Sequence, residues 1–178
     1  MFKLASQKRN PGLTRVPTRT ITTLLVITLA AVAAYAAINY KSGPTFSIST
    51  FDLITTGELS GLGSTAQVLV DAEGTANGSC TNKGGTTVPV HAATVDAAGS
   101  ATLHPDSNGR SNFSVTAAPV ANPNPCPNGN WTFDITSVTY TSATITVTSG
   151  KQSLVNTFTL TGCTQNDPAN PVTCTGTP

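Results

Sequence analysis

The chain is short of charged residues. Aspartate, glutamate, lysine and arginine together make up 10% of its 178 residues, whereas a typical soluble domain has about 25%. Five of the nine basic residues lie in the first twenty positions, so the remainder has four basic and eight acidic side chains, a net charge of −4. A sparsely charged, mildly acidic domain does not attract phosphates, and we therefore expect no binding to nucleic acid.

Patterns that carry chemistry are missing or incomplete. No two cysteines have the CxxC-like spacing of a zinc site, and there is no GxSxG nucleophile elbow near His91 or His104, the only histidines. Asp71 and Glu73 share one face of a predicted strand, as a glycosidase or calcium site would need, but nothing identifies a third oxygen-rich segment. We expect a protein that is not an enzyme and that holds no metal and no cofactor.

Residues 61–66 (GLGSTA) match the GxGxxA form of a dinucleotide-binding fingerprint. That fingerprint requires a helix after the glycines, because the helix N-terminus meets the pyrophosphate. A strand pattern follows here instead. We interpret residues 61–66 as a glycine-bearing turn.

An uncharged hydrophobic segment, residues 21–38, follows the basic N-terminal region, residues 1–20. This order predicts either a cleaved signal peptide or a retained membrane anchor. The small-x-small site at 34–36 favours cleavage, whereas the long basic region favours an anchor. In both cases the remainder is exported, to the extracellular space or the outer face of the cell membrane. We expect contact with the membrane only through residues 21–38, if they are retained.

Alternation of apolar and polar residues predicts strands in most of the exported part. The clearest stretch is residues 131–160, in which three strands are predicted, at 131–136, 143–148 and 154–160. Other candidates are 46–50, 51–62, 66–80 with a bend at Gly74 or Gly78, 87–95, and 113–117. Pro89 predicts that its strand is an edge strand or begins after it.

These strands predict an all-β domain at residues 46–161. A linker at 39–45 precedes it, and a Pro/Thr-rich tail with two cysteines, residues 162–178, follows it. About seven short strands separated by turns favour an immunoglobulin-like Greek-key β-sandwich. A small barrel is the second choice.

The four cysteines all lie in the exported part, where an even number predicts disulfides. Three pairings are open, of which we favour Cys80–Cys126 and Cys163–Cys174. Each bridge would contribute about 3 kcal/mol in the chain-entropy model.

Trp131 and Tyr140 are the two aromatic residues that could form a ligand face, because glycan binding uses flat rings on a sheet. A single tryptophan on an alternating strand usually faces inward, so we favour packing of Trp131 in the core beside Cys126.

Several short motifs, CTN followed by GG at 80–85, CPN at 126–128 and TSATITV at 141–147, resemble a group of small secreted bacterial β-domains without an assigned activity. The resemblance implies an exported β-domain and no particular reaction. We therefore expect a non-catalytic secreted or cell-surface protein with a structural, adhesive or protein-binding role. A carbohydrate-binding module is the alternative, and a small hydrolase or an enzyme inhibitor comes third. The expected partner is an unidentified protein or glycan at the cell surface.

Overall fold

The structure, a computed structural model, describes residues 37–178. Within this range it contains nine β-strands and no helix. The strands are β1 (Asn39–Ser49), β2 (Asp52–Ser60), β3 (Ala66–Asn82), β4 (Thr87–Leu103), β5 (Ser111–Ala121), β6 (Trp131–Ser149), β7 (Gln152–Thr161), β8 (Thr164–Gln165) and β9 (Val172–Thr177).

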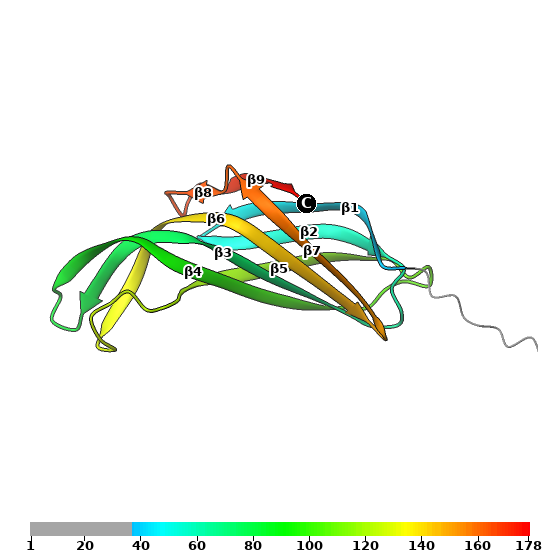
Figure 1. Ribbon diagram of the computed structural model, residues 1–178, viewed down its shortest axis with the longest axis horizontal. Helices are drawn as coiled ribbons and strands as arrows, with labels where there is room; N and C mark the ends of the chain where they lie inside the picture. Colours follow the sequence, from blue (N-terminus) through cyan, green and yellow to red (C-terminus); the bar gives the residue numbers. More distant parts are fainter. Residues whose placement is uncertain (1–36) are drawn as a thin grey trace, which may run out of the picture. The chain divides into compact units, whose positions relative to one another are not determined.

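Eight of these strands form a closed antiparallel barrel (Figure 1). The order around the barrel is β3-β4-β5-β2-β1-β9-β7-β6, and β6 pairs with β3 to close it. The predicted immunoglobulin-like Greek-key sandwich is therefore wrong. Alternation shows which side chains face inward, but it is the same for strands in two stacked sheets and in one sheet closed on itself. Closure depends on which distant strands pair, and the pattern does not contain that information.

The longest strand, β6, spans residues for which two strands were predicted. Thr136 and Thr141 are bulge residues with no partner in β3. Each extra residue reverses the alternation, so the buried positions change from odd to even and back to odd along the strand. On β3 the register shifts fall at Gly74 and Gly78, where a bend was predicted. A Cβ atom on Gly74 would collide with the carbonyl oxygen of Thr139, so glycine is required at this crossing.

The barrel interior is filled by side chains, as expected for eight strands. Inward-facing residues of all eight barrel strands form one core cluster. The largest side chains in it that are almost fully buried are Tyr140, Phe46, Ile48, Leu53, Leu59, Ile145, Val68, Val70, Val95, Val115 and Val138.

The C-terminal residues 162–178, which we expected to be an irregular tail, supply β8 and β9. β9 lies between β1 and β7 and completes the barrel wall. Gly176 interrupts its apolar alternation because the ring of Phe46 fills the adjacent space. A Cβ atom at position 176 would lie 2.7 Å from Cδ2 of Phe46. Similarly, residues 39–45, the expected linker, form the first part of β1.

Candidate functional site

A three-stranded extension projects from one end of the barrel. β4 pairs with β5 only through residues 95–98, so its first part pairs with β3 alone. Residues 75–82 of β3, 87–94 of β4 and 131–137 of β6 therefore continue beyond the barrel wall, at the left in Figure 1. We call this extension the arm.

One face of the arm is apolar. Opposed residues of neighbouring strands share a face, so Val88, Cys80 and Phe133 form one row across the three strands. Val90, Gly78 and Ile135 form the next row, and Trp131 lies opposite Asn82 at the tip. Phe133 and Ile135 also pack against the barrel core. Val88 is 43% exposed, which leaves part of this face accessible.

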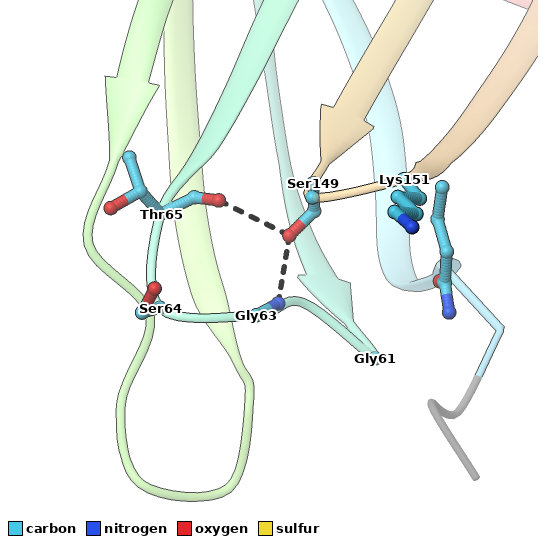
Figure 2. Close-up of a pocket in the computed structure, with 8 residues that line it drawn as sticks. Gly61, Gly63, Ser64, Thr65, Ser149 and Lys151 are labelled. Carbon is cyan, nitrogen blue, oxygen red and sulfur yellow. Dashed lines mark hydrogen bonds between the residues drawn. The ribbon is translucent and has the colours of Figure 1, made fainter. Parts of the chain in front are cut away.

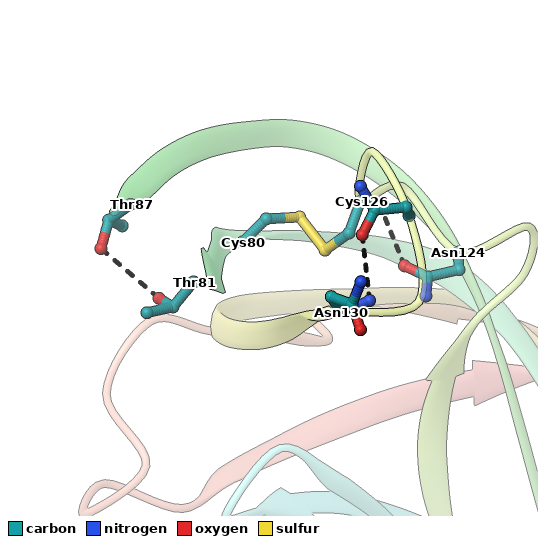
Figure 3. Close-up of a disulfide and its surroundings, with 7 residues drawn as sticks. Cys80, Thr81, Thr87, Asn124, Cys126 and Asn130 are labelled. Carbon is teal, nitrogen blue, oxygen red and sulfur yellow. Dashed lines mark hydrogen bonds between the residues drawn. A yellow bond between two sulfur atoms is a disulfide. The ribbon is translucent and has the colours of Figure 1, made fainter. Parts of the chain in front are cut away.

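A disulfide fastens the β5–β6 loop, residues 122–130, to the apolar face of the arm. Cys80 and Cys126 form this bridge, and Cys163 and Cys174 form the second, so the favoured pairing is confirmed. Figure 3 shows the first bridge beside Asn124, whose Oδ1 accepts a hydrogen bond from the Cys126 N–H at 3.0 Å. The loop thus keeps a defined conformation although it contains three prolines.

Both outer edges of the arm are open. Within residues 37–178, no other strand pairs with the outer edge of β4 at 87–93 or with that of β6 at 131–137. Pro89 lies in the β4 edge, which confirms the edge position that its missing N–H predicted. The β6 edge has no proline and carries Trp131, Phe133 and Ile135 at alternate positions. Unpaired edges of this kind add strands from other chains.

The mouth at the other end of the barrel contains a pocket of about 420 Å³. The GLGSTA segment and the β6–β7 turn line it, as Figure 2 shows. Ser149 is buried and joins the two sides, because its Oγ accepts from the Gly63 N–H at 2.7 Å and donates to the Thr65 carbonyl at 3.2 Å. Lys151 and Gln152 form the opposite rim. The GLGSTA segment precedes strand β3 and not a helix, in agreement with the turn interpretation.

The candidate acid–base residues do not converge. His91 lies in the arm and His104 directly follows β4, so roughly 40 Å of extended strand separates them. Asp71 and Glu73 project from the outer barrel wall, where Asp96 of β4 lies opposite Glu73. Among the described residues, no group of three histidine, cysteine or acidic side chains is placed to hold a metal ion.

The two candidate ligand-face residues lie in different surroundings. Tyr140 is 1% exposed, and its hydroxyl donates a 2.9 Å hydrogen bond to the carbonyl of Phe51, so its ring is not at the surface. Trp131 is half-buried at the tip of the arm and is not part of the core cluster in which we expected it. It begins β6, at the end of the strand that is farthest from the core, so it cannot fill the barrel interior. Both rings lie on the inward face of the sheet, but Tyr140 is enclosed in the barrel and Trp131 lies at the tip of the arm, so they do not form one ligand-binding surface.

No protein-family model matches the chain, and no curated protein or solved structure is significantly similar to it. The resemblance to small secreted β-domains therefore stays a prediction. Residues 37–178 contain no helix that is long and apolar enough to cross a membrane. The predicted signal or anchor at 21–38 lies almost entirely outside the described residues.

Proposed function

We propose that the chain is a non-catalytic binding protein of the extracellular space or cell surface, and that the arm is its protein-binding surface. The main observation in favour is the combination of the open β6 edge with the partly exposed apolar face that carries Val88 and Trp131. Main-chain groups at such an edge provide affinity, and alternate side chains provide specificity. The role is structural or adhesive.

The disulfides support the proposed location. Two bridges and no free cysteine among the described residues are compatible with an oxidising extracellular environment. The basic region followed by a hydrophobic segment favours export of everything after Lys41. Whether the hydrophobic segment is cleaved decides between a free protein and an anchored one. Mass spectrometry of the native N-terminus tests this directly.

The proposal is tested with fluorescently labelled protein and cells of the organism that produces it. A Val88→Thr/Trp131→Ser variant should lose at least about fivefold of its cell-surface binding in flow cytometry, because it removes the exposed apolar groups of the arm. Leu69→Thr is the control, since Leu69 is 38% exposed on the barrel wall and belongs to neither the arm nor β1 or β7. Equal binding of the arm variant and the wild type, with unchanged circular dichroism, would reject the arm as the binding surface.

Carbohydrate binding is the second candidate. A depression of about 440 Å³ near the arm tip is lined by hydroxyl, amide and carboxylate groups, including Asn82, Asn130 and Asp134. These groups suit sugar hydroxyls, although Trp131 does not line the depression. Glycan-array binding that disappears in Asn130→Ala and Asp134→Ala variants would favour this function over protein binding.

A further inference from the structure

The barrel wall is incompletely paired between β1 and β7. β9 joins them through only three residue pairs on each side, at residues 46–48 of β1 and 159–161 of β7. Along residues 39–45 of β1 and 152–158 of β7, the facing edges have no strand partner in the described part of the chain. Figure 1 shows β9 (red) ending before either neighbour does. We call the space between these two edges the seam.

The seam has the width of one strand. β9 runs antiparallel to both β1 and β7, and it pairs with β1 through residues 172–174 and with β7 through residues 175–177. Near the middle of β9 the two strands therefore flank it about 10 Å apart. Further along the seam, the ring of Tyr40 still contacts that of Phe158, with centroids 6.4 Å apart. One extended segment in line with β9 can therefore continue the ladder with β7 and lie beside β1, where residues 39–43 precede Pro44 and keep their N–H groups. Its C-terminal end would lie at the barrel mouth, where β1 and β7 begin.

The strands that border the seam carry three unpaired polar atoms. Tyr40 Oη, Gln152 Oε1 and Asn156 Oδ1 are buried and have no hydrogen-bond partner among the described residues. All three belong to β1 or β7. A buried polar atom is stabilised when it gains a partner, so hydroxyl groups facing inward from an added strand would fit here. Gly176 lies on β9 just before the seam, and a Cβ atom there would collide with the ring of Phe46. Side chains that face inward from an added strand should therefore be small.

The mouth end of the seam is basic. Lys41 is a bulge residue of β1, and Lys151 lies in the turn that leads into β7. Both are exposed, and they are two of only four basic residues in the described part of the chain. The nearest acidic residue in the β1–β2 register is Glu58 of β2, which lines a different depression together with His104 and Arg110.

We infer that the seam binds one extended peptide segment of another polypeptide, in line with β9, with its acidic or carboxylate end at Lys41 and Lys151. Main-chain groups of the peptide complete the two ladders. Small hydroxyl-bearing side chains at alternate positions face Tyr40 and Asn156. The inference shares the premise of protein binding with the proposed function, but it uses a different surface from the arm.

The probe is the peptide Thr-Ser-Val-Ser-Val-Glu with an N-terminal fluorophore and a free carboxylate, titrated with the full chain and followed by fluorescence anisotropy. We expect saturable binding. The same peptide ending in a lysine amide should bind at least about tenfold more weakly, because it places a cation beside two lysines. A version with proline at both serine positions should lose binding too, since it lacks the N–H groups of one ladder.

Two lysine variants locate the peptide. Lys41→Gln and Lys151→Gln should each weaken binding of the acidic peptide by about fivefold, whereas the matched control Lys83→Gln, in the β3–β4 turn of the arm, should not. Trp131→Ser should also leave peptide binding unchanged. These variants therefore test protein binding by the arm and peptide binding by the seam independently of each other.

A version of the protein with the peptide fused to its C-terminus tests the inference even if the free peptide binds weakly. Adding the same six residues after Pro178 supplies the strand at high effective concentration. Amide hydrogen exchange at 39–45 and 153–157 should then slow, and the melting temperature should rise by roughly 3 °C or more. Protection in the tethered protein supports the inference even if the free peptide binds weakly. Unchanged hydrogen exchange in the tethered protein would overturn the inference. It would also be overturned if the unmodified protein dimerised and the dimer protected the same amides, because a second copy would then occupy the seam.

Discussion

The hydroxyl of Tyr140 donates a hydrogen bond of 2.9 Å to the carbonyl oxygen of Phe51. Gln165 holds the same residue from the other side, because its Oε1 accepts the Phe51 N–H at 2.7 Å. Phe51 has a positive φ of 70°, and it forms the two-residue β1–β2 turn together with Thr50. Two side chains from the β6 and β8 strands thus hold a turn conformation that non-glycine residues rarely adopt.

Tyr140→Phe should lower the free energy of unfolding by about 1–2 kcal/mol, because it leaves the Phe51 carbonyl without its partner. Urea denaturation measures the change. Tyr40→Phe is the matched control, since the Tyr40 hydroxyl is buried but has no partner among the described residues. Its removal should leave the free energy of unfolding unchanged or raise it, because no hydrogen bond is lost and an unpaired buried group is removed. Equal losses in the two variants would contradict the assigned hydrogen bond.

Thr50→Asn should stabilise the protein by several tenths to about 1 kcal/mol. Thr50 has a φ of 54°, a region that asparagine tolerates far better than a β-branched residue. Thr102→Asn on β4 is the control, and it should destabilise slightly because threonine is the better strand residue. Thermal unfolding followed by circular dichroism compares the two. A lower melting temperature for Thr50→Asn would speak against the turn conformation.

Gly176→Ala should destabilise the barrel by roughly 1–3 kcal/mol, because the added methyl group overlaps the ring of Phe46. Gly129→Ala is a suitable comparison, since a Cβ atom there meets nothing within 4 Å. Chemical denaturation of both variants measures the difference. Equal stability of the two would mean that β9 does not pack over Phe46.

Alkaline pH should unfold the protein before its two described tyrosines ionise in the folded state. Burial raises the pKa of Tyr40 to about 12, and burial with a smaller effect of the Asp52 carboxylate raises the pKa of Tyr140 further. Both folded pKa values exceed the unfolded value near 10, so this stabilisation is complete below pH 10 and is lost as the pH rises through 12. In a Tyr35→Phe background, absorbance at 295 nm should stay flat to about pH 11. A phenolate signal near pH 10 with intact circular dichroism would show that these rings are accessible.

The two disulfides should contribute unequally. Cys80–Cys126 spans 46 residues and Cys163–Cys174 spans 11, which corresponds to about 4 and about 3 kcal/mol in the chain-entropy model. Replacing each pair by alanine and measuring denaturant unfolding tests this order. The Cys80→Ala/Cys126→Ala variant should also become sensitive to proteolysis within residues 122–130. A loop that resists protease without its bridge would show that other contacts hold it.

The sequence predicted the strands better than their arrangement. Alternation located the segments that became β2, β3, β5 and β7, and Pro89 correctly indicated an edge. It divided β6 into two strands because bulges at Thr136 and Thr141 reverse the alternation twice. It also missed β9, since Gly176 takes an inward position that an apolar side chain would otherwise mark.

The candidate site was predicted only in part. The even number of cysteines and their positions in the sequence predicted the correct disulfides. The predicted ligand face was wrong, because Trp131 and Tyr140 belong to the same strand but lie in different surroundings. Tyr140 becomes a core residue because it lies between the two bulges, where even-numbered positions face inward. The arm and the seam exist because hydrogen-bonded pairing between distant strands ends at particular residues. The local alternation of apolar and polar residues does not predict where that pairing ends.

The pairing of β1 with β9 also governs when the barrel can form. β1 pairs with β9, which is formed by residues 172–177, so the barrel closes only after these residues have left the ribosome. Contacts between such distant residues form slowly. During that delay the chain stays open, as the export proposed above requires.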